Sequence, residues 1–160
     1  MSYTFQFGVL WEYAPYIAKG IWFTLKISFW SIFWSTIIGI LLASVQVSKN
    51  KGLRTAAIIY IDIFRTIPLV CLLIWIHYVL PILVKTDFTP VQSAILALSL
   101  NGGALASEAF RGGMEAIPHT QLQAAHSLGF SQLGTLRHVI VPQAFYSTLP
   151  PLTNVYITTI

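Results

Sequence analysis

Residues 27–48 read ISFWSIFWSTIIGILLASVQVS and contain no charged side chain. A helix needs roughly 20 apolar residues to cross the ~30 Å hydrocarbon core of a bilayer, and in lipid a helix pairs its own backbone groups. Three further charge-free runs follow, at 66–84, 88–107 and 138–160. The sequence therefore predicts one all-α membrane domain over 1–160, with membrane helices at about 20–48, 56–83, 88–110 and 139–160 and a cytoplasmic loop at 111–138.

The composition also indicates lipid as the surrounding solvent. Of the 160 residues, 56% are hydrophobic and 9% are charged, with a mean hydropathy of +0.72. Soluble domains carry about 25% charged residues, so this chain has too few charges to cover a surface that faces water. The net charge of +4 comes from scattered Lys and Arg side chains, which argues against nucleic-acid binding. Cys71 is the only cysteine, so no intrachain disulfide can form.

The charges in the links between these runs predict the orientation. The first link carries Lys49, Lys51 and Arg54 and no acid, whereas the segment with Glu12 and Lys19 is neutral. The link with Lys85 and Asp87 is also neutral. Cytoplasmic loops are enriched in Lys and Arg, so we expect the first link inside and the N-terminus outside.

Prolines predict two interruptions. Pro68 disfavours a helical conformation at Ile67 and removes a backbone donor, so Tyr60–Thr66 is expected to be distinct from the span that follows. Pro150 and Pro151 are expected to interrupt the last run. Broken membrane helices are tolerated where protein or a water-filled cavity covers them and often lie on a substrate path.

Charged residues three apart on a helix can pair. We expect Asp62 with Arg65, and Glu108 with Arg111, to form structural salt bridges at span ends, with a ligand role for the first pair and gating for the second as alternatives. In the third run, small residues four apart, such as Gly102 with Ala106, predict close helix packing.

The loop carries the most specific pattern. Thr120 and Gln123 have capping-box spacing, which predicts a short helix from Gln121 to Leu128. Gly129 suits the left-handed position after that helix, and Ser131 can cap a second helix that runs toward Pro142. The small side chains of Ala124 and Ala125 would let another protein approach this projection closely.

The loop resembles the signature loop of binding-protein-dependent ABC permeases, which reads Glu-Ala-Ala, three residues, Gly, nine residues, then Ile-x-Leu-Pro. This chain has Gln123-Ala124-Ala125, Gly129 and Val139-Ile140-Val141-Pro142 at the same spacings, with Gln123 in place of the glutamate. Other segments resemble polar amino acid permeases of the histidine, glutamine and glutamate/aspartate group. They are residues 21–26, 64–70, 108–113, 142–145 and 149–154.

The resemblance implies a type I importer bundle with about five membrane helices per subunit, of which this chain would hold four and stop within the fourth. It implies a non-catalytic permease subunit in the bacterial inner membrane, with a second permease subunit, identical or different, and an extracytoplasmic solute-binding protein. A separate pair of ATPases would bind ATP and Mg²⁺, and the helix near Gln121 would dock in an ATPase groove. The second span, with Ile67 and Leu73-Ile74-Trp75, most resembles glutamate/aspartate permeases.

Other chemistry finds little support in the sequence. No lysine follows glycine and precedes Ser or Thr in a phosphate-binding loop, and the four histidines are too dispersed to predict a metal site. Polar groups within apolar spans are expensive and often functional, so Ser99, Asn101, Thr153 and Asn154 are candidate substrate contacts, with interhelical hydrogen bonding as the alternative. A membrane scaffold and an ion-coupled carrier are the competing functions. A carrier calls for intramembrane acids, whereas Asp62 and Glu108 fall near span ends.

Overall fold

The computed structural model describes residues 11, 13–48 and 50–159. Glu12, Lys49 and Ile160, which entered the arguments above, lie outside the described residues, as do the N-terminal ten residues and the side chain of His126. All regular secondary structure in the described residues is helical. These are α2 (Ala14–Gln46), α3 (Lys51–Thr66), α4 (Leu69–Ile74), the π-helix η1 (Trp75–Val79), α5 (Leu80–Val84), α6 (Pro90–Glu115), α7 (His119–Ser127), α8 (Gln132–Thr135), the π-helix η2 (Leu136–Ile140) and α9 (Val141–Thr159).

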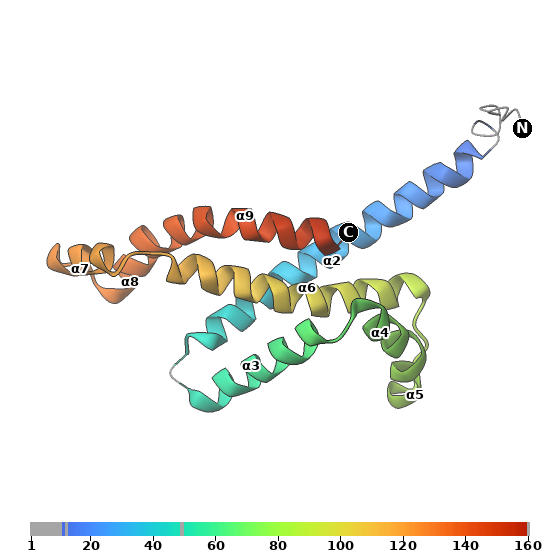
Figure 1. The fold of residues 1–160 in the computed structure, drawn as a ribbon, viewed down its shortest axis with the longest axis horizontal. Coiled ribbons are helices and arrows are strands. Elements are labelled where there is room, and N and C mark those ends of the chain that lie inside the picture. Colours follow the sequence, from blue (N-terminus) through green and yellow to red (C-terminus); the bar gives the residue numbers. More distant parts are fainter. Residues whose placement is uncertain (1–10, 12, 49, 160) are drawn as a thin grey trace, which may run out of the picture.

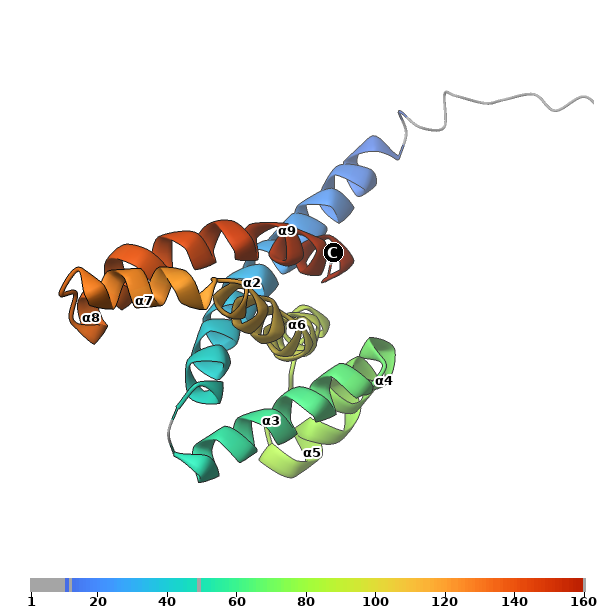
Figure 2. The same cartoon turned by 60° about the vertical axis from the view of Figure 1, so that its left-hand side comes forward.

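Helix α6 is the centre of the bundle, and it packs against α2, α3, α4 and α9. Figure 1 shows α9 beside α6 and the N-terminal part of α2 projecting beyond the other helices. Figure 2 shows α3, α4 and α5 together on one side of α6, with α7 and α8 at the far end of α9. The elements that carry the loop pattern therefore form one extremity of the bundle.

Small residues form the contact between α2 and α6. The buried residues of α2 lie along one stripe of the helix: Ser31, Ser35, Gly39, Ala43 and Gln46. A Cβ atom on Gly39 would lie 2.8 Å from the Ala106 Cβ, and one on Gly103 would lie 2.8 Å from the Ile38 Cβ. Close approach through small side chains is how helices associate in lipid. The predicted packing role of the glycine- and alanine-rich third run is confirmed.

The second predicted span is not one straight helix. Its first helix starts at Lys51 rather than near residue 56. Asn50 caps this start, because its Oδ1 accepts hydrogen bonds from the backbone N–H groups of Gly52 and Leu53. The helix ends at Thr66, and the segment Leu69–Val84 continues at an angle of 103°. Extended geometry at Ile67, with ψ 125°, marks the bend. The break predicted at Pro68 is therefore present and sharp.

The predicted interruption of the last run at Pro150 and Pro151 is wrong. Helix α9 runs from Val141 to Thr159 through both Pro150 and Pro151. Buried side chains on either side of the prolines hold it against α6, because Thr148 contacts Gly113 and Leu152 packs with Ala106. Tertiary packing supplies most of a helix's stability and here offsets the two missing donors. Pro150 and Pro151 thus mark no broken helix.

Both π-helices precede a proline at the same spacing. η1 ends at Val79, two residues before Pro81, and η2 ends at Ile140, two residues before Pro142. At the end of η1, the Leu80 N–H bonds to the Trp75 carbonyl, five residues back. A proline ring clashes with the carbonyl four residues earlier, and a wider turn relieves that clash. Each π-helix therefore has an identifiable local cause.

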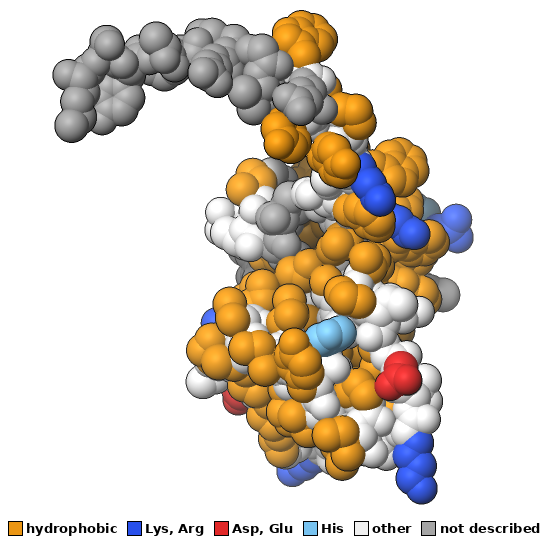
Figure 3. All heavy atoms as spheres, turned by 90° about the vertical axis from the view of Figure 1, so that its right-hand side faces the viewer, with side chains coloured by type: hydrophobic (Ala, Val, Ile, Leu, Met, Phe, Trp, Pro, Cys, Tyr) orange, Lys and Arg blue, Asp and Glu red, His pale blue; other side chains and the backbone are white. Residues whose placement is uncertain are grey.

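Large hydrophobic side chains cover the outside of the bundle. Trp22, Ile82 and Tyr146 are 68%, 76% and 75% exposed, and hydrophobic atoms dominate the face in Figure 3. Among the described residues, α2 alone is both long and apolar enough to cross a membrane, and α3 with Leu69–Val84 meets the same test only as a bent pair. The exterior has the character of a surface in contact with lipid.

Candidate functional site

Helix α7 begins two residues earlier than predicted. It spans His119–Ser127, and its first turn closes where the Gln121 N–H donates to the Pro118 carbonyl at 3.0 Å. Thr120 therefore lies inside the helix and does not cap it, so the predicted capping box is wrong. Pro118 cannot continue the preceding chain as helix because it lacks an N–H, and its carbonyl takes the capping position instead.

Gly129 ends this segment as predicted. Its φ of +81° lies in the left-handed region that favours glycine. The Phe130 N–H reaches back to the Ala125 carbonyl at 3.1 Å, and the Leu128 N–H donates to the Ala124 carbonyl at 3.0 Å. These bonds pair carbonyls that a helix end would otherwise leave free. The corner after α7 is thus fixed by backbone geometry.

Ser131 caps the next helical segment, also as predicted. Its Oγ accepts from the Gly134 N–H at 3.1 Å, and its carbonyl accepts from the Thr135 N–H at 2.8 Å. The segment does not stop at Pro142, because α8, η2 and α9 follow one another without a gap. The corner at Gly129 therefore joins α7 to one long helical run that packs on α6.

Helix α7 turns one side inward and the other outward. Ala125 is 4% exposed, so the prediction that its side chain would let another protein approach closely is wrong. Thr120, Gln123, Ala124 and Ser127 are all exposed. These four residues recur at i, i+3, i+4 and i+7, the spacing of one helix face. Because this helix is predicted to dock on a partner, we name them the docking face. The predicted contacts Gln121 and Leu128 are exposed beside it, and Pro142 is exposed in the first turn of α9. The docking face is small and carries no formal charge.

A network of charged side chains lies near the C-terminal end of α6. Arg111 Nη2 lies 2.7 Å from Glu108 Oε2, which confirms the predicted pair, and Arg111 Nη1 lies 2.7 Å from Glu115 Oε2. Arg65 Nη1 of α3 lies 3.7 Å from Glu108 Oε2. The predicted Asp62–Arg65 pair is wrong, since no ion pair of Asp62 occurs among the described residues. Packing of α3 on α6 brings Arg65 to the carboxylate of Glu108, which is farther away along the chain than Asp62.

The same network lines an open pocket of about 410 Å³ between α2, α3 and α6. Hydrogen bonds to Glu108 and Glu115 hold the pKa of the Arg111 guanidinium above its ordinary value, so this side chain stays charged. Gln46 is buried beside the network, and its Nε2 has no hydrogen-bond partner among the described residues. The ion pair between Arg65 and Glu108 joins α3 to α6 at one end of the bundle.

The four candidate substrate contacts do not converge. Ser99 is 3% exposed, and its hydroxyl donates to the Ile95 carbonyl at 2.6 Å. Asn101 Nδ2 donates to the Phe64 carbonyl at 2.6 Å. Thr153 and Asn154 are exposed on α9, and the Thr153 hydroxyl donates to the Leu149 carbonyl at 2.8 Å. Asn101 therefore makes the interhelical hydrogen bond of the alternative interpretation, whereas Ser99 bonds within its own helix.

Sequence reasoning missed two polar contacts that join distant segments. The Thr36 hydroxyl and the Tyr156 hydroxyl lie 2.5 Å apart and link α2 to α9. The His77 Nδ1 lies 3.0 Å from the Ser93 hydroxyl and links η1 to α6. Neither pair has a local sequence signal, because the partners are far apart along the chain. No group of three His, Cys, Asp or Glu that could hold a metal occurs within the described part of the chain.

Comparison with known sequences identifies relatives over nearly the whole chain. Residues 35–160 match the family model described as "Binding-protein-dependent transport system inner membrane component". A probable amino-acid ABC transporter permease of Bacillus subtilis is 36% identical over 96% of this chain and 68% of its own length. The L-cystine permease of the same species is 35% identical over 91% of this chain and 62% of its own. A putative glutamine permease of Rickettsia bellii is 36% identical over 93% of this chain and 70% of its own.

Solved structures share the fold. A crystal structure of an amino acid ABC transporter with histidines matches with a TM-score of 0.88 and 29% identity, over 98% of this chain and 72% of that one. An inward-facing methionine ABC transporter matches with a TM-score of 0.73 and 24% identity over 97% of this chain and 73% of that one, which supports the fold alone. These matches confirm the all-α importer bundle and a non-catalytic subunit. The chain belongs to the family of inner-membrane permease components of binding-protein-dependent ABC transport systems.

Proposed function

We propose that this chain is the membrane subunit of an ATP-driven importer of polar amino acids, in which α7 docks on a partner ATPase. The observation that carries the docking proposal is the exposed docking face on a helix whose end is fixed by Gly129 and Ser131. This helix lies at one extremity of the bundle (Figure 1). The amino acid class is supported by the permeases that the chain resembles, whose names specify amino acids, glutamine and L-cystine.

In this proposal the chain moves in response to ATP but does not bind it. Two ATPase subunits bind ATP and Mg²⁺, close on each other and displace α7. The connection from Ser131 through α8 and η2 passes that displacement to α9, which packs on α6. ATP can shift the pathway between inward and outward states only through contacts that differ between those states. The docking face is the surface where such contacts are expected to form.

The remaining partners follow from the same family. A second permease subunit, identical or different, forms the other wall of the pathway, and an extracytoplasmic binding protein delivers the amino acid. The exposed Lys51 and Arg54 favour a cytoplasmic position for the start of α3, which puts the N-terminus outside. Glutamate and aspartate are the narrower substrate proposal, from the resemblance of the second span to permeases of that type.

The docking proposal is tested by an arginine placed on the docking face. In the transporter with its ATPase, Ala124→Arg should reduce uptake at least 10-fold and reduce copurification of the ATPase, because the larger charged side chain blocks close approach. Ala116→Arg is the matched control, since Ala116 is exposed near the same loop but outside α7. Normal uptake and copurification in Ala124→Arg would overturn the docking role. Uptake of labelled glutamate, aspartate, glutamine and cystine by the unaltered transporter tests the substrate class separately.

A further inference from the structure

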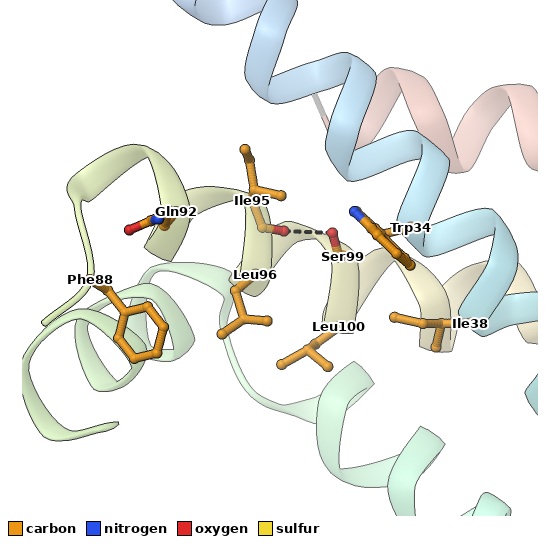
Figure 4. Close-up of a pocket in the computed structure, with 8 residues that line it drawn as sticks. All are labelled: Trp34, Ile38, Phe88, Gln92, Ile95, Leu96, Ser99 and Leu100. Carbon is orange, nitrogen blue, oxygen red and sulfur yellow. Dashed lines mark hydrogen bonds between the residues drawn. The ribbon is translucent and has the colours of Figure 1, made fainter. Parts of the chain in front are cut away.

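Two adjoining pockets of about 370 Å³ and 500 Å³ lie between α2 and the N-terminal half of α6. They share Trp34, Gln92 and Ile95 as lining residues, and together we name them the groove. Figure 4 shows the first of them, with Trp34 and Ile38 on α2 facing Ile95, Ser99 and Leu100 on α6. The Ser99 hydroxyl is already bonded to the Ile95 carbonyl, so it offers this space no free donor.

The lining of the groove changes from polar to apolar along its length. Lys26 and Thr89 line only the outer section, Ile38, Leu96 and Leu100 line only the inner one, and Gln92 lines both. Lys26 is the only charged side chain among the residues that line the two pockets. An occupant that matches this lining has an anion at one end and a long apolar body.

Gln92 has a donor to offer at the polar end. Its Oε1 accepts from the backbone N–H of Thr89 at 2.9 Å and from the Thr89 hydroxyl at 3.0 Å. These two bonds fix the carboxamide and leave its Nε2 without an acceptor among the described residues. Lys26 and Gln92 therefore provide a cation and an amide donor at the same end of the groove.

The groove has the length of one leaflet of a bilayer. Lys26 and Ile38 are twelve positions apart on α2, which corresponds to about 18 Å at 1.5 Å per residue. Half of the ~30 Å hydrocarbon core is about 15 Å. Trp30 and Trp34 lie along this path. An acyl chain fits the dimension and the polarity of the groove.

We propose that this groove binds one phospholipid, with its phosphate at Lys26 and Gln92 and one acyl chain along Trp34, Ile95 and Leu100. A free amino acid fits less well, because its ammonium group needs an anionic partner and no acid lines the groove. The proposal is independent of the docking of α7 and of the amino acid transported. It assigns a specific ligand to the groove between α2 and α6.

Quenching of Trp34 fluorescence by brominated phosphatidylglycerol tests the proposal. The probe is the delipidated detergent-solubilised transporter, with Trp11, Trp22, Trp30 and Trp75 of this chain replaced by Phe and the tryptophans of the other subunits likewise removed. At limiting lipid, quenching should saturate. Lys26→Gln should raise the half-saturating lipid concentration at least threefold, whereas Lys19→Gln, an exposed lysine of α2 outside the groove, should leave it unchanged.

A second pair of variants tests the apolar section. Ile95→Phe fills the groove where its two sections meet and should remove the saturable quenching, while Ile59→Phe, on the exposed surface of α3, should retain it. If Ile95→Phe does not fold, the lysine pair decides alone. Equal lipid affinity in Lys26→Gln and Lys19→Gln overturns the proposal. Relief of quenching by free glutamine also overturns it and would assign the groove to amino acids. Absence of saturation overturns it as well, because quenching would then come from non-specific contact with lipid.

Discussion

The Nδ2 group of Asn101 donates a 2.6 Å hydrogen bond to the carbonyl of Phe64, which lies four residues before Pro68. In an uninterrupted helix that carbonyl would accept from the N–H of residue 68, but proline has none. Asn101 on α6 therefore supplies to this carbonyl the donor that Pro68 lacks. The bend of 103° is held by a side chain from a different helix.

Replacement of Asn101 should destabilise the fold rather than change substrate selection. Asn101→Leu leaves the part-buried Phe64 carbonyl without this partner. The cost should be at the low end of the about 1–3 kcal/mol that an unsatisfied buried acceptor costs. We expect a lower unfolding temperature in detergent, measured by thermal denaturation. Asn154→Leu is the control, because Asn154 is exposed. A normal unfolding temperature in Asn101→Leu, together with altered substrate preference, would restore Asn101 as a substrate contact.

Alanine substitutions at the adjacent glycines of α6 should have different effects on the stability of the fold. A Cβ on Gly113 would collide with the Thr148 hydroxyl and lie 3.2 Å from the Ala144 carbonyl, whereas one on Gly112 would meet nothing within 4 Å. Gly113→Ala should destabilise the packing of α6 on α9 by about 1–3 kcal/mol. Gly112→Ala should be neutral or stabilising by about 0.5–1 kcal/mol, because alanine favours helix. Thermal unfolding compares them, and equal effects would contradict the close approach of α9.

The corner after α7 should depend on backbone conformation rather than on space. At Gly129 φ is +81°, and an added Cβ would meet nothing within 4 Å. Gly129→Val should reduce uptake strongly, since a β-branched residue is strained in this region. Gly129→Asn should retain most of it, because asparagine visits the left-handed region more readily. Labelled amino acid uptake measures both, and full uptake by the valine variant would show that the corner is dispensable.

The ion pair between α3 and α6 should be measurable but weak. Arg65 and Glu108 are 3.7 Å apart, and their side chains are 46% and 28% exposed. Pairs of this kind contribute about 0–1 kcal/mol. A double-mutant cycle with Arg65→Gln and Glu108→Gln should give a coupling in that range, and the cycle of Arg65→Gln with Asp62→Asn should give none. A larger coupling to Asp62 would favour the pair that the sequence suggested.

The orientation can be tested with single cysteines in a Cys71→Ser background. Lys51→Cys, at the exposed start of α3, should resist an impermeant thiol reagent applied to intact cells, because its basic link is expected inside. Asp87→Cys, in the link before α6, should react. The cysteine is placed at residue 51 rather than at its neighbour Asn50, because the Asn50 side chain caps α3 and its replacement would disturb the helix. Faster labelling at 51 than at 87 would reverse the topology.

Features set by neighbouring residues were predictable from the sequence. The break at Pro68, the left-handed Gly129, the cap at Ser131 and the pair of Glu108 with Arg111 each depend on groups within a few positions of one another. One local error concerns where α7 begins. The Gln121 N–H donates to the Pro118 carbonyl, so the helix starts before Thr120, and Thr120 cannot take the cap position.

Features that depend on tertiary contact were not predictable in this way. The partner of Arg65 is 43 positions away, and that of Asn101 is 37 positions away. The continuity of α9 through Pro150 and Pro151 likewise depends on α6, which the spacing of residues within α9 does not reveal. A single sequence specifies which side chains need partners, but the packing of the helices determines which partners they meet.

The π-helix η2 sets the rotational phase between the docking face and α9. A π turn contains one residue more than an α turn, so it acts as a single-residue insertion in the helical run from Gln132 to Thr159. Removing one residue between Leu136 and Ile140 would rotate everything before it by about 100° relative to α9, since an α-helix has 3.6 residues per turn. The direction in which the docking face points, relative to α9, therefore depends on one extra residue in the helical run ahead of Pro142.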